Sequence, residues 1–223
     1  MTFSSCLTNQ DKVIVLDASV IINLLATANA GAILQALNAD LVVTGNVVRE
    51  IDQGAANGRS ESKYLAELID SRVLRVEELA VPSLEYFFDM VSGHTSDSLG
   101  DGEAATLAFA CSNGFSAAID EKKATRIAGE RFEAMKLVTT IDILAYGAVQ
   151  ALLGHEVLVN ATLQALKVAR MQVRPHQFDW VVRLIGEDNL AECATLKKLA
   201  RRRTQSLDTT MPIASLDSRR LQS

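Results

Sequence analysis

Short apolar runs alternate with helical patterns from the start of the chain to about residue 140. The runs are rich in β-branched or small residues, which predicts strands at 13–16, 41–43, 73–76, 115–119 and 137–138. Between them, apolar residues recur every three or four positions, which predicts helices at 18–26, 30–37, 45–53, 60–69, 82–91, 102–111 and 121–132. Strands that alternate with helices favour an α/β fold with a mainly parallel sheet and helices on both faces.

The strand pattern stops after Thr140. Helical spacing continues, which predicts helices at 141–153, 157–171, 175–185 and 189–200. The last stretch is polar and has too few apolar residues to pack. We therefore expect a domain at 1–153, a helical C-terminal extension at 154–203 and an unstructured tail at 204–223.

The composition is that of a folded globular protein, with 48% apolar and 22% charged residues. No apolar run approaches the roughly 20 residues that cross a bilayer, and the polar start differs from a secretory signal. We expect a cytoplasmic protein that does not enter a membrane. Cys6, Cys111 and Cys193 lie far apart without a Cys-x-x-Cys pair, so we expect reduced thiols, with Cys111 in the core.

The charge is unevenly distributed, although the net value of −5 argues against a general nucleic-acid coat. Residues 1–150 contain 11 Lys and Arg against 20 Asp and Glu, giving −9, and residues 151–223 contain 11 against 7, giving +4. With this distribution, the acidic part could supply carboxylates that bind a metal ion, and the basic part could supply cations that attract phosphate. A solvated surface explains it almost as well.

Two predicted strands end in aspartate, Asp17 and Asp120. Ligands of open parallel sheets bind outside the carboxyl ends of the strands, so both positions are candidates for chemistry. Glu50 interrupts an apolar helix, and Asp101 and Glu103 begin a helix of small residues. Several buried carboxylates require a cation, and oxygen ligands suit Mg²⁺ or Mn²⁺. Such an ion activates water and stabilises a leaving 3′ oxygen in phosphodiester cleavage.

Each acid also has an ordinary structural explanation. Glu50 is the hardest to explain in this way, although a glutamate at a helix edge can pair with an arginine. Asp17 and Asp120 can cap the helices that follow them. Asp101 and Glu103 can favour the dipole of their helix. Only the ordered set, with every acid in a suitable local context, favours a metal site.

Four segments resemble the acidic motifs of PIN-domain ribonucleases: Val-Ile-Val-Leu-Asp17-Ala-Ser19, Val-Val-Arg-Glu50-Ile, Gly-Asp101-Gly-Glu103-Ala-Ala-Thr-Leu-Ala and Ala-Ala-Ile-Asp120-Glu-Lys-Lys-Ala. The resemblance covers about residues 12–150. The Leu-Gly-x-Gly-Glu-Ala form of the third motif is similar to a bacterial and archaeal subgroup whose chain continues through C-terminal helices.

The resemblance implies a three-layer α/β/α sandwich with a C-terminal helical appendage. It also implies a Mg²⁺- or Mn²⁺-dependent endoribonuclease that cleaves single-stranded or loop RNA with an activated water. The implied metal ligands are Asp17, Glu50, Glu103 and Asp120. Ser19 takes the place of the hydroxyl that orients the first aspartate, and Asp101 is an alternative third ligand.

The family includes toxins of toxin–antitoxin pairs, so an antitoxin protein and a second copy of the chain are further expected partners. Many members carry Asp or Asn two residues after the fourth acid, where this chain has Lys122. The number of metal ions therefore stays open.

Two groups of cations are candidates for RNA contact. Their members are Lys122, Lys123 and Arg126 after the fourth acid, and Arg201, Arg202 and Arg203 at the end of the extension. Solvated surface charge is the alternative for both groups. We expect His94, His155 and His176 to be surface residues and Trp180 to be a packing residue.

Two rival functions belong to other classes. A phosphotransferase with Asp17 as nucleophile, as in haloacid-dehalogenase-like enzymes, requires a second acid two residues on, where this chain has Ser19. The other rival is a PIN-fold module that has lost catalysis and binds RNA or a protein. The presence of all four acids argues against that loss.

Overall fold

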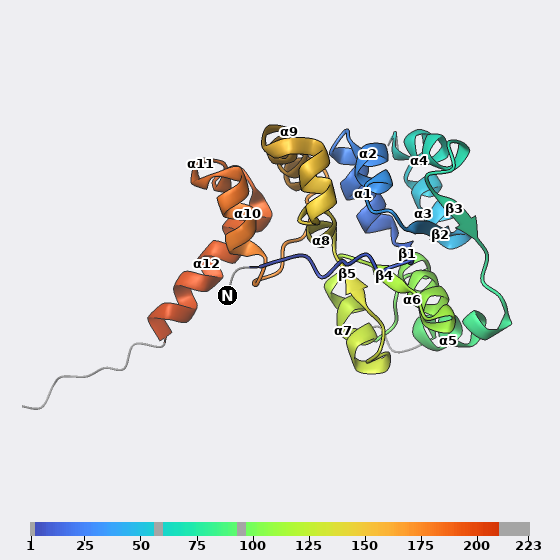
Figure 1. Ribbon diagram of the computed structural model, residues 1–223. Coiled ribbons are helices and arrows are strands. Elements are labelled where there is room, and N and C mark those ends of the chain that lie inside the picture. Colours follow the sequence, from blue (N-terminus) through green and yellow to red (C-terminus); the bar gives the residue numbers. More distant parts are fainter. Residues whose placement is uncertain (1–2, 56–59, 93–96, 210–223) are drawn as a thin grey trace, which may run out of the picture.

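The computed structural model describes residues 3–55, 60–92 and 97–209. The strands of these residues form one five-stranded parallel sheet in the order β3-β2-β1-β4-β5 (Figure 1). They are β1 (Val13–Leu16), β2 (Asp40–Thr44), β3 (Arg75–Glu77), β4 (Ser116–Ala118) and β5 (Leu137–Val138). The predicted parallel sheet is confirmed. The chain builds outward from β1 to β3 and then crosses back to β4, so the carboxyl ends of β1 and β4 flank the point where strand order reverses.

Helices cover both faces of the sheet, which is why its strands are apolar on both sides. One face packs against α1 (Ala18–Ala26), α2 (Ala30–Gln35), α4 (Glu61–Asp70), α8 (Thr140–Leu144) and α9 (Gly147–Lys167). The opposite face packs against α5 (Val81–Val91), α6 (Asp101–Asn113) and α7 (Lys122–Arg131) (Figure 1). Helix α3 (Gly45–Ala55) contacts both α4 and α6. The expected three-layer α/β/α sandwich is confirmed.

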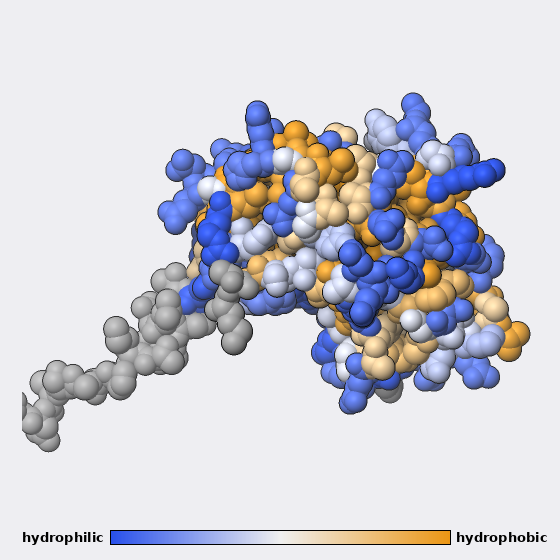
Figure 2. Space-filling model, viewed as in Figure 1, coloured by the Kyte–Doolittle hydropathy of each residue, from blue (hydrophilic) through white to orange (hydrophobic). Residues whose placement is uncertain are grey.

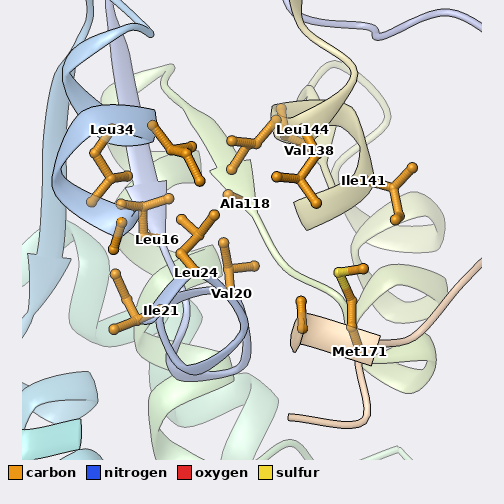
Figure 3. Close-up of a cluster of buried hydrophobic side chains, with 14 of the residues drawn as sticks. Leu16, Val20, Ile21, Leu24, Leu34, Ala118, Val138, Ile141, Leu144 and Met171 are labelled. Atoms are coloured by element: carbon orange, nitrogen blue, oxygen red, sulfur yellow. The ribbon is translucent and has the colours of Figure 1, made fainter. Parts of the chain in front are cut away.

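The alternating side chains of β1 reach two separate cores. Leu16 lies in the larger core with Leu24 and Ile141 (Figure 3), and Val15 lies in the smaller core under α6. Each fully buried Leu or Ile contributes roughly 1.5–3 kcal/mol to folding. The sheet is therefore fixed from both sides, and its carboxyl edge is a rigid platform.

The helices beyond the sheet begin with a kinked segment. Gly154 has a φ of 69° inside α9, a conformation that favours glycine, so the helix breaks between the two predicted helices 141–153 and 157–171. The helices that follow are α10 (Phe178–Ile185), α11 (Glu187–Leu190) and α12 (Ala194–Thr209). Helices α10 and α11 lie beside α9, and α12 runs from α10 away from the sheet (Figure 1). Helix α12 continues past Arg203 to Thr209, into the segment expected to be unstructured. The rest of that tail lies outside the described residues.

Several smaller expectations concern single side chains. Trp180 packs edge-on against Phe3, with ring centroids 5.9 Å apart, as expected of a packing residue. His155 and His176 are exposed, and His94 lies outside the described residues. The expectation for Cys111 is wrong, because its side chain is only half-buried at the C-terminal end of α6, whereas Cys193 is in the core.

The surface carries mostly hydrophilic side chains with hydrophobic residues among them on the face shown in Figure 2. Among the described residues, every helix is too short or too polar to cross a membrane.

Candidate active site

Asp17 follows β1 directly and caps α1. Its Oδ2 accepts hydrogen bonds from the backbone N–H of Ser19 at 3.1 Å and from Ser19 Oγ at 2.6 Å. The residue is 2% exposed, yet its Oδ1 has no hydrogen-bond partner among the described residues. Burial raises the pKa of Asp17 in spite of the hydrogen bonds from Ser19. Capping therefore explains one carboxylate oxygen and leaves the other as an atom that a cation would stabilise.

Asp120 follows β4 after Ile119 and is held from two helices. Its Oδ1 accepts from the backbone N–H of Thr140 at 2.9 Å, and its Oδ2 accepts from Asn23 Nδ2 at 2.6 Å and from Thr140 Oγ1. All three residues are buried. Burial raises the pKa of Asp120, and these hydrogen bonds oppose that rise. The cap of α7 is Glu121, so helix capping does not account for Asp120.

Ser19 links the two aspartates. Its hydroxyl donates to Asp17 Oδ2 and lies 3.4 Å from the backbone N–H of Asp120, which donates to it. The first turn of α1 thus joins the carboxyl ends of β1 and β4. A serine at this position places both acids relative to one another.

Glu50 extends from α3 toward the first turn of α6. Its Oε2 takes up the space that a Cβ on Gly102 would occupy, so the carboxylate approaches the α6 backbone where a side chain is missing. Burial, followed by the charges of Asp17 and Asp101, raises the pKa of Glu50. Gly102, which lies between Asp101 and Glu103, therefore leaves room for the carboxylate of Glu50.

Glu103 is half-buried in the first turn of α6, and Asp101 is exposed beside it. Glu103 Oε2 accepts from the backbone N–H of Gly100 at 3.2 Å, which closes a capping box. The pKa of Glu103 rises to about 7 through burial and the charge of Asp17, with smaller contributions from Glu121 and Glu50. Capping and a role in the carboxylate cluster coexist here, and burial beside Asp17 favours Glu103 over Asp101 as a ligand.

Glu121 is an acid of this cluster that the motif pattern did not single out. It caps α7 by accepting from the backbone N–H of Ala124 at 2.7 Å, and its charge raises the pKa values of Asp17 and Glu103. Its place directly after Asp120 was the available signal, but the family pattern points to position 122 for a further acid. Asn23 and Thr140 were also missed, because only the fold brings α1 and α8 to Asp120.

The first group of candidate RNA-binding cations lies on α7 and is distinct from the residues whose hydrogen bonds hold Asp17 and Asp120. Arg126 forms surface ion pairs with Glu130 at 2.9 Å and with Asp97 at 3.2 Å. Lys122 and Lys123 stand in the first turn of α7, where Lys122 is exposed. Their role in RNA binding stays a prediction.

The second group of cations lies on α12, which packs with the other C-terminal helices (Figure 1). Arg201 and Arg202 are exposed there. Arg203 pairs with Asp179 at 2.6 Å and stacks over Phe178, with 5.0 Å from its guanidinium carbon to the ring centroid. Arg203 thus has a structural role in joining α12 to α10, and an RNA role for this group stays a prediction.

The donor set fits a hard divalent cation in its chemistry. It consists of carboxylate oxygens, one of them buried and unpartnered, and the acids raise one another's pKa values. As the side chains stand in residues 3–55, 60–92 and 97–209, no three His, Cys, Asp or Glu converge closely enough to hold a metal ion. A cation held by this set would require side chains to change position, and Glu50, which is exposed, and Glu103, which is half-buried, have the room to do so.

Comparison with known proteins supplies the family. A family model described as a PIN domain matches residues 13–187, well over half of the chain. A search of curated proteins finds no match. Among solved structures, VapBC2 from Rickettsia felis bound to a DNA fragment from its promoter is similar, with 12% identity over 57% of this chain and 98% of that chain and a TM-score of 0.41. On the family model, which spans the sheet, all four acidic motifs and α10, the chain belongs to the PIN-domain family.

Proposed function

We propose that the chain is a Mg²⁺- or Mn²⁺-dependent endoribonuclease that cleaves single-stranded or loop RNA. Members of the PIN-domain family are generally nucleases, and they generally use divalent metal ions. The observation that carries the proposal is Asp17 Oδ1, which is buried without a partner among the described residues. It lies at the edge of the sheet where strand order reverses, beside Glu103, whose pKa is raised to about 7 by burial and then by the charge of Asp17.

Asp17, Glu50, Glu103 and Asp120 would hold the cation. When bound, it supplies positive charge to the scissile phosphate and the leaving 3′ oxygen and lowers the pKa of the attacking water. The remaining work falls to the chain itself.

The protein's own contribution is to fix the two aspartates in advance of substrate binding. Ser19 holds one oxygen of Asp17, and Thr140 and Asn23 hold both oxygens of Asp120. Groups that are already oriented lose little entropy in the transition state, so this network supports catalysis through preorganisation. Lys122 and Lys123, at the start of α7, are the cations that we expect to attract the RNA backbone.

The test is cleavage of an end-labelled, mixed-sequence single-stranded RNA with Mn²⁺, with Mg²⁺ and with EDTA. We expect cleavage by the wild type with either metal and none with EDTA, Asp17→Asn or Asp120→Asn. Asp40→Asn is the matched control, because Asp40 is exposed at the amino end of β2, away from the site. Metal-independent cleavage, or full activity in both site variants, contradicts the proposal. A wild type that binds RNA without cutting it favours the inactive binding module.

The family resemblance leads us to expect a toxin role, an antitoxin partner and a homodimer. The sequence pattern leads us to expect a cytoplasmic location and a division between 1–153 and 154–203. For the toxin role, expression of the wild type should arrest growth of the host cell, and Asp17→Asn should not. Growth arrest by both proteins would show that it does not arise from cleavage.

A further inference from the structure

One cation from the C-terminal region reaches the carboxylate site. Arg174 lies in the segment between α9 and α10, and its Nη2 donates to the backbone oxygen of Asp120 at 2.9 Å. The same nitrogen donates to Thr125 Oγ1 at 2.7 Å and lies 3.5 Å from the backbone oxygen of Glu121. A single side chain thus joins the C-terminal segment to the turn between β4 and α7, which carries two acids of the site.

Gln177, from the same segment, reaches the other element that positions Asp120. It is fully buried, its Oε1 accepts from the backbone N–H of Arg174 at 2.9 Å, and its Nε2 donates to Thr139 Oγ1 at 2.8 Å. Thr139 caps α8, and Thr140, the first residue of α8, holds both oxygens of Asp120. Arg174 and Gln177 therefore contact the two sides of the Asp120 network.

The segment is anchored firmly enough to transmit these contacts. Met171 and Val173 are each 1% exposed and lie in the larger core. Met171 belongs to the same side-chain cluster as Val20 and Ile141 (Figure 3). Helices α1 and α8, which supply Asn23 and Thr140 to the site, pack against that cluster.

Arg174 also places a positive charge next to the acids of the site. The guanidinium of Arg174 is half-buried and interacts electrostatically with Asp120, Glu121 and Asp142. Charge-assisted hydrogen bonds are roughly twice as strong as neutral ones, so backbone carbonyls held by an arginine resist displacement. The charge of Arg174 also opposes the rise that burial causes in the pKa of Asp120.

We propose that Arg174 and Gln177 form a clamp through which the C-terminal segment completes the active site, with Arg174 as a positioning residue that holds Asp120 and Glu121 in place for the cation. The effect on catalysis rests on the proposed nuclease function. The effect on the turn does not depend on it. The family model's match extends through both residues to 187, beyond the last acid of the site.

The test compares Arg174→Ala and Arg174→Lys with Arg183→Ala, whose arginine is exposed on α10. The first readout is amide hydrogen exchange in the metal-free protein, at Ala124, Thr125 and Thr140, whose N–H groups donate within this network. We expect faster exchange at these amides in Arg174→Ala, partial recovery in Arg174→Lys, and wild-type exchange in Arg183→Ala. The melting temperature shows whether each variant is folded.

The second readout is the dissociation constant for Mn²⁺, with kcat and KM on the cleaved RNA. Loss of a residue that orients metal ligands typically costs about 10–100-fold in affinity or activity, and we expect that loss in Arg174→Ala with KM unchanged. Unchanged exchange and unchanged Mn²⁺ affinity overturn the clamp. A raised KM with unchanged exchange also overturns it, because Arg174 would then contact RNA. If the wild type neither cleaves RNA nor binds Mn²⁺, the proposed function fails, and the exchange data still decide whether the clamp exists.

Discussion

The ionised carboxylate of Glu103 lowers the stability of the fold when no metal is bound. Burial and neighbouring charges raise its pKa from 4.5 to about 7, so the folded protein binds this proton more tightly than the unfolded chain does. The corresponding stabilisation is complete below the unfolded value of 4.5 and is lost as pH rises through about 7. A bound divalent cation would replace the proton as the source of positive charge.

Glu103→Gln separates the charge of this residue from its capping role. The amide oxygen still accepts from Gly100, since Gln also completes a capping box. At a pH above 7 and in EDTA, we expect the variant to melt about 2–4 °C above the wild type for each 1 kcal/mol of repulsion removed. We also expect weaker Mn²⁺ binding. Melting curves across the range from pH 4.5 to 8 test this, and a variant with the wild-type pH dependence would contradict it.

Gly102→Ala tests the approach of Glu50 to α6. The added Cβ meets the Glu50 carboxylate, which ends a flexible side chain and can swing away, so the fold should persist. Alanine is favoured over glycine in a helix by roughly 0.5–1 kcal/mol, so the melting temperature should stay level or rise. Cleavage and Mn²⁺ affinity should fall because Glu50 is displaced. Gly129→Ala, in α7 with open space around its Cβ position, is the control. Wild-type activity in Gly102→Ala would mean that Glu50 is not a ligand.

At the scale of elements, the amino end of α8 holds Asp120. Thr140→Val removes the hydroxyl that bonds Asp120 Oδ2 and leaves the backbone N–H in place. Loss of a partner for a buried charged group costs about 1–3 kcal/mol, and cleavage should fall with it. Thr162→Val is the matched control, because Thr162 is equally buried and its hydroxyl donates to the backbone oxygen of Leu158 in its own helix. The two variants should differ in activity far more than in melting temperature, and equal activity would contradict the role of α8.

Sequence alone was enough for the elements whose signals are local. The β-branched run at β1 and the acids that follow β1 and β4 are readable because a buried strand and its end have a distinct pattern. Asn23, Thr140 and Arg174 were not readable, since they lie 97, 20 and 54 positions from Asp120 and meet it only through the fold. Cys111 was misplaced because apolar neighbours on a helix do not tell which face meets the core.

At the scale of the whole molecule, the sheet and the C-terminal helices share one core. Leu196 on α12 is fully buried in the same cluster as Leu16 of β1. Leu196→Ala should destabilise the protein by about 2–5 kcal/mol and keep a single unfolding transition. Leu152→Ala, at a position that is 56% exposed, should have little effect. Calorimetry is the measurement, and a separate early transition in Leu196→Ala would show that the C-terminal helices unfold independently.

Titration of the purified protein with Mn²⁺ by calorimetry tests most directly whether the carboxylate edge of the sheet is a metal site, because the RNA target need not be known. The wild type and Asp40→Asn should bind Mn²⁺ alike above pH 7, and Asp17→Asn should lose that binding. Wild-type affinity in Asp17→Asn, or no binding by any of the three proteins, would contradict the metal-dependent mechanism.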